Sequence, residues 1–223
     1  MPAPMPGKVV GMSEARDYLP EPADLQDAGF TTVSGSHGDR RDRLLALVGD
    51  LASALSVERL IMSLRGSARS VAGADGITVV RREGDRVRYV AEDAVSSLWE
   101  GQSFSVEQCI SGLAMIENRP IVIPDVYVDS RVPIDAYQRT FVRSMAMFPI
   151  GRSAPTLAMG AYWAKAGMPD PEVIQLLASL ARAAGSSFER IGRKERGTAG
   201  SPQARSSSPS GARESTPLPP LAS

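Results

Sequence analysis

Two neighbouring segments, 141–151 and 155–164, constrain the fold of this chain most, because each is apolar on both of its alternating faces. In the first segment, one face holds Ala146, Phe148 and Ile150 and the other holds Met145 and Met147. In the second segment, one face holds Leu157, Met159, Ala161 and Trp163 and the other holds Ala158, Gly160 and Tyr162. A β-strand without a solvated face belongs in the middle of a sheet that is covered on both sides. We therefore expect two central strands, with one layer of chain above the sheet and another below it.

Helical patterns on either side of the central region predict one of these layers. Apolar residues recur at three- and four-residue spacing over 39–54, and again from the capping residue Ser56 to Gly73. These two stripes are Leu44, Leu47, Val48, Leu51 and Leu55, and then Leu60, Ile61, Leu64, Ala68 and Val71. A last helix begins after the capping residue Asp170, with Pro171 at its first position. Its stripe is Val173, Leu176, Leu177, Leu180, Ala184 and Phe188.

Residues 76–83 and 85–91 alternate β-branched residues with arginine around a Glu-Gly-Asp turn, which predicts a β-hairpin. Arg82, Arg86 and Arg88 lie beside this turn. They form either a binding patch or, as we expect, the solvated face of an edge strand, where charge discourages edge-to-edge association.

The middle segment predicts a helix over 105–118 and a short buried strand over 121–123. The apolar or small positions of that helix are Cys109, Gly112, Leu113 and Ile116. The Arg-Pro pair that follows ends it, because the residue before a proline disfavours helical dihedrals. We expect loop over 125–136 and a helical turn over 136–140.

Composition divides the chain into one folded domain and two tails. Residues 1–38 and 192–223 lack any lasting apolar period and are rich in proline, glycine or serine, so we expect both to be disordered. The domain is expected to span 39–191. His37, the only histidine, falls in the leader, where a solvated loop residue is the expectation.

Charge and cysteine content exclude several classes of protein. The 25 basic and 25 acidic side chains cancel, which argues against a nucleic-acid partner. No apolar run approaches the length of a membrane span, and the start of the chain lacks the pattern of a secretory signal. One cysteine cannot form an internal disulfide. The chain is therefore predicted to be cytoplasmic, without a membrane partner.

Residues 99–150 hold the only cysteine, three of the five phenylalanines and one of the two tryptophans. Concentrated aromatic area with few polar groups is typical of a small-molecule pocket, and equally of the core of a compact domain. Asp125, Asp129, Arg131 and Asp135 in this stretch either bind a polar ligand or a metal through oxygen or, as we expect, shape the loop and pair on the surface.

Four motifs together resemble the GAF domains found ahead of sensor histidine kinases. They are CISGLAM (109–115), RPIVIPDVYVDSRVP (119–133), AYQRTFVRSMAMFPI (136–150) and GAYWA (160–164). The resemblance covers residues 41–190 and implies an α+β fold, with a central antiparallel sheet, terminal helices on one face and a pocket beneath a lid segment on the other. It also implies a homodimer formed through the terminal helices, or a histidine kinase or other signalling protein as partner in trans.

By the same resemblance, thirteen residues line the pocket. They are Trp99, Phe104, Cys109, Ser111, Gly112, Met115, Asp125, Tyr127, Tyr137, Phe141, Arg143, Ser144 and Met147. The resemblance does not identify the ligand or cofactor, because GAF domains bind cyclic nucleotides, bilins, haem, small acids or no known ligand.

Residue types argue against several of these ligands and against catalysis. Bilin-binding relatives carry a histidine near their cysteine, whereas Ile110 follows Cys109 and His37 lies outside the domain. Haem held by histidine is disfavoured for the same reason, and clusters of cysteine and histidine for a metal are excluded by count. A GAF-fold reductase of free methionine sulfoxide depends on more than one cysteine, and Cys109 has no resolving thiol. A serine nucleophile would need His37 as its base, and His37 lies outside the predicted domain, so serine catalysis is disfavoured as well.

We therefore predict a stand-alone sensory domain without catalytic output that binds a small molecule, a partner protein or both. Two alternatives stay open. One is an adaptor whose pocket is closed and whose helical face alone matters, which a completely filled lid side would favour. The other is a redox sensor based on an exposed Cys109 thiol, which a buried Cys109 would disfavour.

Overall fold

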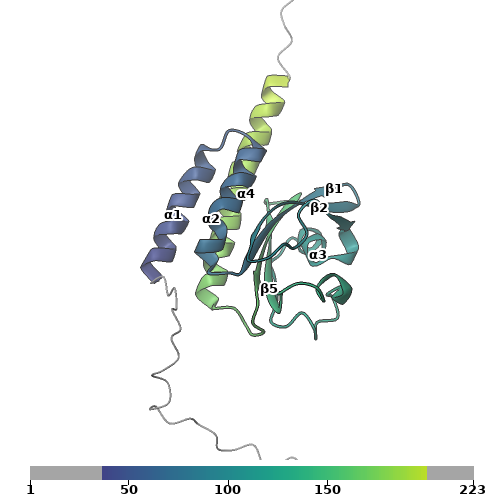
Figure 1. Cartoon of the computed structure of the whole chain (residues 1–223). Helices are drawn as coiled ribbons and strands as arrows, with labels where there is room; N and C mark the ends of the chain where they lie inside the picture. The colour runs from purple at the N-terminus through teal and green to yellow at the C-terminus, as the bar shows by residue number, and fades with distance from the viewer. Residues whose placement is uncertain (1–36, 200–223) are drawn as a thin grey trace, which may run out of the picture. The chain divides into compact units, whose positions relative to one another are not determined.

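The structure is a computed structural model that describes residues 37–199 (Figure 1). Its helices are α1 (His37–Ser53), α2 (Val57–Ala72), α3 (Ile110–Glu117) and α4 (Pro171–Ala199). Its strands are β1 (Gly76–Glu83), β2 (Arg86–Ala94), β3 (Ser103–Ser105), β4 (Ile121–Ile123), β5 (Ser144–Ile150) and β6 (Leu157–Trp163). Two single 3₁₀ turns, η1 (Val106–Gln108) and η2 (Ile134–Ala136), complete the elements. Of the disorder predicted for 1–38 and 192–223, the part that falls on 1–36 and 200–223 lies outside the described residues.

The six strands form one antiparallel sheet in the order β3-β2-β1-β6-β5-β4. The two doubly apolar segments of the sequence are β5 and β6, which pair with each other in a register that sets Met145 against Tyr162 and Ala146 against Ala161. Both strands have a neighbour on each side, and both are almost entirely buried. The predicted α+β architecture with a doubly covered sheet is confirmed.

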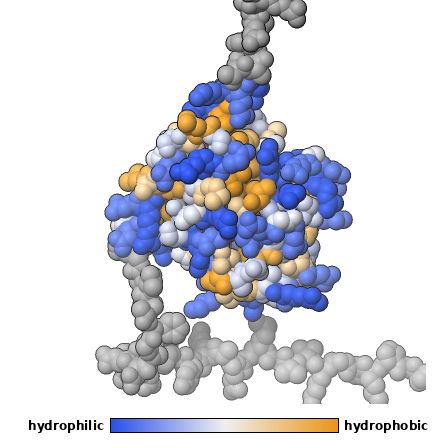
Figure 2. All heavy atoms as spheres, turned by 45° about the horizontal axis from the view of Figure 1, so that its top comes forward, coloured by the Kyte–Doolittle hydropathy of each residue, from blue (hydrophilic) through white to orange (hydrophobic). Residues whose placement is uncertain are grey.

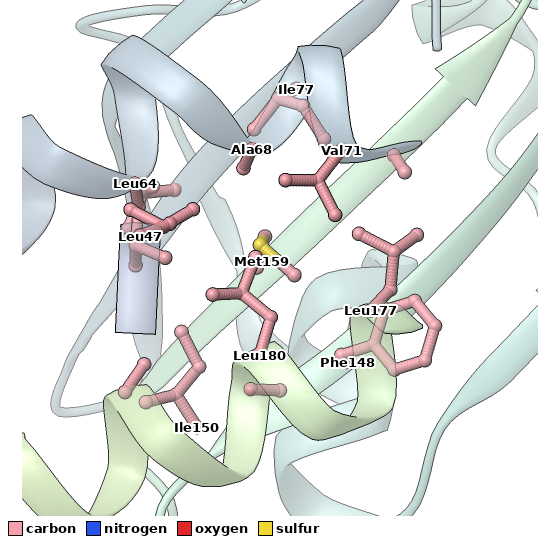
Figure 3. Close-up of a cluster of buried hydrophobic side chains, with 14 of the residues drawn as sticks. Leu47, Leu64, Ala68, Val71, Ile77, Phe148, Ile150, Met159, Leu177 and Leu180 are labelled. Carbon is pink, nitrogen blue, oxygen red and sulfur yellow. The ribbon is translucent and has the colours of Figure 1, made fainter. Parts of the chain in front are cut away.

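Helices α1, α2 and α4 lie together on one face of the sheet (Figure 1). Their apolar stripes meet the strands in a first core, which we call the helical core. Met159 and Phe148 of the sheet are buried in it. Figure 3 shows Leu64, Leu177 and Leu180 of the helices around these two side chains. Burial of these aliphatic and aromatic groups is what holds the helical layer on the sheet.

Capping residues explain where α2 begins and ends and where α4 begins. The hydroxyl of Ser56 accepts the backbone N–H of Arg59 at 3.2 Å, and Gly73 ends α2 in the left-handed conformation with φ 57°. The carboxylate of Asp170 accepts the N–H of Glu172 at 2.8 Å at the start of α4. These predicted boundaries are confirmed. Among the described helices none is long and apolar enough to cross a membrane.

The opposite face of the sheet is covered by residues 98–142, which we call the lid. The lid contains η1, α3, β4 and η2, and its apolar side chains pack on β2, β5 and β6 in a second core. We call this second set of buried residues the lid core. The lid core and the helical core lie on opposite faces of the sheet.

Four predicted boundaries differ from the structure. Leu55 follows α1 and is 73% exposed, so it does not belong to the buried stripe. Helix α1 begins at His37, inside the predicted leader, and α4 continues to Ala199, inside the predicted tail. The predicted helix over 105–118 is instead η1 followed by α3, because Cys109 between them is extended, with φ −142° and ψ 150°.

Strand β2 is not the edge strand that its arginines suggested. Residues Arg86 and Arg88 pair with Ser105 and Ser103 of β3, which forms this edge of the sheet. The two arginines are nonetheless exposed, as predicted for a solvated face. Arg86 donates to the Ser103 carbonyl at 2.9 Å, so one acceptor of the edge is already used.

Candidate functional site

Aromatic rings fill the centre of the lid core. Trp99 lies 4.9 Å from the ring of Tyr137, 5.4 Å from Tyr89 and 5.5 Å from Tyr162, measured between centroids. All four side chains are buried, and Phe104 at the rim meets Tyr89 edge-on at 5.6 Å. Tilted and edge-on contacts of this kind stabilise a packed aromatic cluster. The interior beneath the lid is occupied by side chains.

A chain of hydroxyl groups runs through this cluster. Thr78 and Tyr162 share a hydrogen bond of 2.9 Å, and the hydroxyl of Tyr162 also interacts with that of Tyr89. Tyr89 continues to Ser111 at 3.5 Å, and Ser111 meets the Cys109 sulfur at 3.4 Å. Each hydroxyl both donates and accepts, so the chain can reverse its direction without moving heavy atoms.

Gly160 explains how the Tyr162 ring reaches this position. A Cβ atom at Gly160 would lie 2.5 Å from the Tyr162 hydroxyl oxygen and 2.9 Å from the Met147 methyl group. The missing side chain leaves the floor of the lid core free for the ring. Only glycine fits here without a shift of its neighbours.

Backbone hydrogen bonds fix Trp99 over the cluster. The Glu92 carboxylate on β2 accepts the N–H groups of Leu98, Trp99 and Glu100 at 3.1, 2.9 and 2.8 Å. On the other side, the indole N–H of Trp99 donates to the Ala136 carbonyl at 3.2 Å. Trp99 therefore joins β2 to the part of the lid near η2.

Burial keeps the titratable groups of the lid core uncharged. It raises the pKa of the Tyr89, Tyr137 and Tyr162 hydroxyls well above their ordinary value, because a phenolate would lose its hydration there. Burial also raises the pKa of the Cys109 thiol, although the hydroxyl of Ser111 partly opposes the shift. Each of these groups is therefore protonated at neutral pH.

The structure brings most of the predicted site residues together. Seven of the thirteen are buried on the lid side of the sheet: Trp99, Cys109, Ser111, Gly112, Met115, Tyr137 and Met147. Phe104 and Phe141 are half-buried and pack against the lid core from its rim. The prediction that Cys109 is a small buried group is confirmed, since its side chain is only 4% exposed.

Three predicted residues instead form a cluster on the surface. The Arg143 guanidinium lies 5.0 Å from the centre of the Tyr127 ring and 3.4 Å from the Asp125 carboxylate. Tyr127 is 46% exposed, and Arg143 is exposed as well. Their predicted position beneath the lid is wrong: Asp125 and Tyr127 follow β4, Arg143 directly precedes β5, and the three meet on the surface.

Ser144 also lies elsewhere than predicted. Alternate residues of a strand point to the same face, so Ser144 lies on the face of Ala146 and Phe148, which is covered by the helices. Its hydroxyl donates to the Lys165 carbonyl at 2.8 Å. The alternation of β5 contained this information in the sequence. Four residues that sequence reasoning did not assign to the site, Thr78, Tyr89, Glu92 and Tyr162, complete the lid core or position it.

A hollow opens beside the lid core at its rim. It has a volume of about 490 Å³, and we call it the lid hollow. Its lining residues are Phe104, Ser105, Gln108, Ser130, Arg131, Val132, Pro133, Asp135 and Ala136. Phe104 lines the hollow, and its ring also meets that of Tyr89 edge-on at 5.6 Å, so the hollow and the hydroxyl chain have this ring as a common neighbour.

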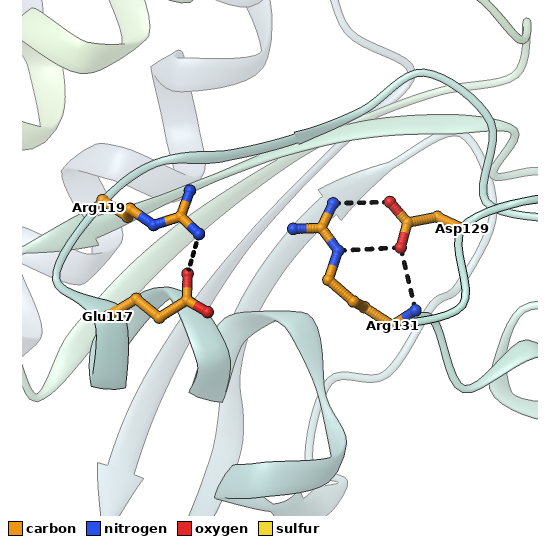
Figure 4. A network of polar contacts seen from close by, with 4 residues as sticks. All are labelled: Glu117, Arg119, Asp129 and Arg131. Carbon is orange, nitrogen blue, oxygen red and sulfur yellow. Dashed lines mark hydrogen bonds and ion pairs between the residues drawn. The ribbon is translucent and has the colours of Figure 1, made fainter.

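Arg131, the cation that lines the lid hollow, is held in an ion pair, whereas Asp135 in the same lining accepts a hydrogen bond from the Gln138 amide at 3.5 Å. Arg131 donates to both oxygens of the Asp129 carboxylate, at 2.9 and 2.6 Å, and Arg119 pairs with Glu117 nearby (Figure 4). The arginine lowers the pKa of Asp129, chiefly through its side-chain hydrogen bonds. This confirms the predicted surface ion pair and a loop-shaping role, since Asp129 also accepts the backbone N–H of Arg131 at 3.0 Å.

Residues 37–199 show no cluster of side chains for a metal ion. No group of three or more histidine, cysteine, aspartate or glutamate side chains in this part of the chain is placed to hold a metal ion. The buried polar side chains of the same residues, apart from the tyrosines, are Thr78, Ser111, Ser144 and Ser187. The lid core therefore offers hydroxyl groups and aromatic faces.

Comparison with known proteins defines the fold. No protein-family model and no curated protein matches the sequence. The GAF domain of an Acinetobacter phosphoenolpyruvate-protein phosphotransferase superposes with a TM-score of 0.59 at 10% identity, over 70% of this chain and 97% of that domain. The chromophore-binding domain of a bacteriophytochrome from R. palustris gives 0.59 at 15% identity, over 71% and 62% of the two chains. Free methionine-R-sulfoxide reductase from Neisseria meningitidis gives 0.60 at 14% identity, over 70% and 92%.

The fold of this chain is thus the GAF-domain fold, as its motifs indicated. Likeness at 10–15% identity establishes the fold alone. The similar structures include an enzyme and a chromophore-binding domain, so the fold does not by itself select a function.

Proposed function

We propose that this chain is a non-catalytic sensory domain that takes up a small molecule on its lid face and acts on a partner through its helical face. The observation that carries the proposal is a physical connection between the two faces around the edge of the sheet. It is made by the loop that follows β2.

This loop contacts both layers at once. Its Trp99 lies at the centre of the lid core, and the next residue, Glu100, lies 3.7 Å from Arg65 of helix α2. At the end of β2, Asp93 pairs with Arg69 of the same helix at 3.0 Å. A displacement of Trp99 by a ligand would therefore pull on α2 without any change in the sheet itself. Exposed ion pairs of this kind contribute about 0–1 kcal/mol each to stability, so they can break and re-form when a ligand binds.

The state of Cys109 supports the absence of catalysis. Its thiol is buried, its pKa is raised by burial, and it is the only cysteine of the chain. A thiol in that state is a poor nucleophile, and no second thiol is present to resolve an oxidised form. The same facts disfavour a redox sensor.

Native mass spectrometry of protein purified from its own cells tests the proposal. We expect a retained small molecule at one per chain, and we expect Ala136→Trp to abolish it, because this side chain lines the lid hollow. Ser153→Trp is the matched control, since Ser153 is an exposed residue between β5 and β6. Absence of added mass in wild type, or equal retention in the Ala136→Trp variant, would count against ligand binding at the lid.

A second candidate, a dimeric adaptor, is favoured by the filled interior of the lid core and by an unpaired apolar seam on α1. Leu45 on α1 is 68% exposed. Together with the half-buried Val48 and the exposed Ala52, it repeats at the spacing of a coiled-coil seam, and the 73% exposed Leu55 lies just beyond the end of the helix. Figure 2 shows the surface as largely hydrophilic, with hydrophobic residues in separate patches. We propose that a second copy of the chain covers this seam.

Sedimentation velocity at micromolar concentration distinguishes this candidate. The wild type is expected to sediment as a dimer and Leu45→Glu as a monomer, because a charge in a buried seam lacks a partner. Val95→Glu, which alters an apolar residue of similar exposure outside the helices, is expected to stay dimeric. A monomeric wild type would rule out the dimer. It would not affect ligand binding, which native mass spectrometry tests separately.

A further inference from the structure

The lid core is uncharged throughout, and this property limits the molecules it can take. Its buried polar members are three tyrosines, one threonine, one serine and one thiol, and the others are aliphatic, aromatic or thioether side chains. The described charged residues that border it are Glu92, whose carboxylate accepts three backbone N–H groups, Asp135 in the lining of the lid hollow, and the paired Arg131 and Asp129. An anion placed among the tyrosines would lose its hydration without gaining an unpaired cation as partner.

The hydroxyl groups of the lid core have hydrogen-bonding capacity left. Good O–H···O bonds measure about 2.7–2.8 Å. Ser111 reaches the Tyr89 hydroxyl only at 3.5 Å, and its other neighbour is the Cys109 sulfur, a weak hydrogen-bonding group, at 3.4 Å. The hydroxyl of Tyr137 donates to the sulfur of Met145 at 3.7 Å, and sulfur is a weak acceptor. A ligand oxygen at either position would replace a long or weak bond with a strong one.

A route leads to these groups from outside. The lid hollow ends at Phe104, whose half-buried ring covers Tyr89 edge-on. Rotation of this one ring would join the hollow of about 490 Å³ to the hydroxyl chain. A monocyclic molecule is of the size that such a hollow admits.

We propose that the lid core takes an uncharged monocyclic molecule carrying a hydroxyl or carbonyl group, which enters past Phe104 and hydrogen-bonds to Ser111 and Tyr137. The ring of the ligand packs among the aromatic side chains around Trp99. Anionic molecules such as carboxylates and phosphates are rejected. The proposal rests on the ligand-binding function proposed above and names the class of its ligand.

Methyl NMR with benzyl alcohol and benzoate, two probes of equal ring size that differ in charge, tests the proposal. In the full chain labelled with ¹³C at the methionine methyl groups, millimolar benzyl alcohol is expected to shift the signals of Met145 and Met147 in the lid core. The signal of Met159, which lies in the helical core, is expected to stay in place as an internal control. Benzoate at the same concentration is expected to shift none of the three.

Variants tie the shifts to the proposed hydrogen bonds. Ser111→Ala and Tyr137→Phe are each expected to weaken benzyl alcohol binding by roughly fivefold to tenfold, the equivalent of one hydrogen bond. Ser187→Ala, which removes a buried hydroxyl on helix α4, is the control and is expected to leave the affinity unchanged. Phe104→Ala is expected to speed association.

The outcomes separate the ligand class from ligand binding itself. If benzoate shifts Met145 and Met147 as strongly as benzyl alcohol does, the uncharged class is wrong and the lid core remains a binding site. If neither probe shifts them in wild type or in the Phe104→Ala variant, the ligand class proposed here is wrong, and ligand binding at the lid is then decided by the mass measurement. Equal affinity in Ser111→Ala, Tyr137→Phe and wild type would overturn the assigned anchors.

Discussion

Glu92 accepts the backbone N–H of Trp99 at 2.9 Å, and through this bond the end of β2 sets the position of the lid. The same carboxylate accepts two further N–H groups on either side, from Leu98 and Glu100. Three donors on one carboxylate fix the entry of the chain into the lid and hold the Trp99 indole over the tyrosines. Charge-assisted bonds of this type are stronger than those between neutral groups.

Glu92→Ala is expected to destabilise the protein by about 2 kcal/mol, because three backbone donors lose a charged acceptor and the half-buried site is only partly hydrated. Urea unfolding followed by circular dichroism measures the effect. Glu83→Ala removes an exposed carboxylate at the end of β1 and is expected to change the free energy of unfolding by less than about 0.5 kcal/mol. Equal midpoints for the two variants would contradict the role of Glu92.

Gly112→Ala is expected to cost about 3 kcal/mol or more, because a Cβ atom there would overlap the Val106 carbonyl of η1. Gly66→Ala provides the matched substitution on α2, where no atom lies within 4 Å of the new methyl group. It is expected to stabilise the protein by about 0.5–1 kcal/mol through its higher helix propensity. Thermal unfolding of the two variants gives the comparison, and a stable Gly112→Ala would show that η1 does not pack on α3 as described.

Thr78 and Tyr162 are expected to be energetically coupled, because their 2.9 Å hydrogen bond is fully buried. Tyr162→Phe or Thr78→Val alone leaves one hydroxyl with fewer partners and is expected to cost about 1–3 kcal/mol. The double variant is expected to cost less than the sum of the two. A double-mutant cycle by urea unfolding measures the coupling, and strict additivity would contradict it.

Stability is expected to fall in alkaline solution. Burial raises the pKa of the Cys109 thiol above its ordinary 9.0 and that of the Tyr137 and Tyr162 hydroxyls above 10.0. The unfolded chain therefore loses these protons at a lower pH than the folded chain does. The contribution is fully present below about pH 9 and is lost as the pH rises further. Urea midpoints between pH 7 and 11 should show this decline, with a shallower slope for Tyr162→Phe, whereas a flat profile would disagree.

Cys109 is expected to react slowly with dithionitrobenzoate in the native protein. The thiol is 4% exposed and protonated at neutral pH, so reaction requires local opening of the lid. Absorbance at neutral pH is expected to show a rate roughly a hundredfold or more below that of the urea-unfolded chain. A native thiol that reacts as fast as the unfolded one would revive the redox-sensor alternative.

Features fixed by local chemistry could be predicted from the sequence. Ser56 and Asp170 mark the starts of α2 and α4 because a capping side chain bonds only two or three residues away. The doubly apolar strands β5 and β6 were recognisable because a strand buried on both faces has no polar residue at every second position. The motifs that resemble GAF domains added the order of the elements and the position of the lid.

Features that depend on tertiary contacts could not be predicted. The break between η1 and α3 arises where the Val106 carbonyl packs on Gly112, a contact that no local pattern shows. Tyr127 follows β4 and Arg143 directly precedes β5, and the two meet on the surface, so the resemblance placed them wrongly beneath the lid. Helix α4 outlasts its apolar stripe because the charged residues after Ile191 are good helix formers and extend an existing helix at low cost.

Coupling between the lid and the helices is the central claim, and the dimer dissociation constant measured by sedimentation with and without saturating benzyl alcohol tests it most directly. Because linkage is reciprocal, occupancy of the lid core is expected to change this constant by roughly fivefold or more in wild type. The change should disappear in the Arg65→Ala, Arg69→Ala double variant, which removes the ion pairs of α2 with the end of β2 and with the loop that follows it. An unchanged constant in wild type, while the methyl signals of Met145 and Met147 report a filled lid core, would contradict the account.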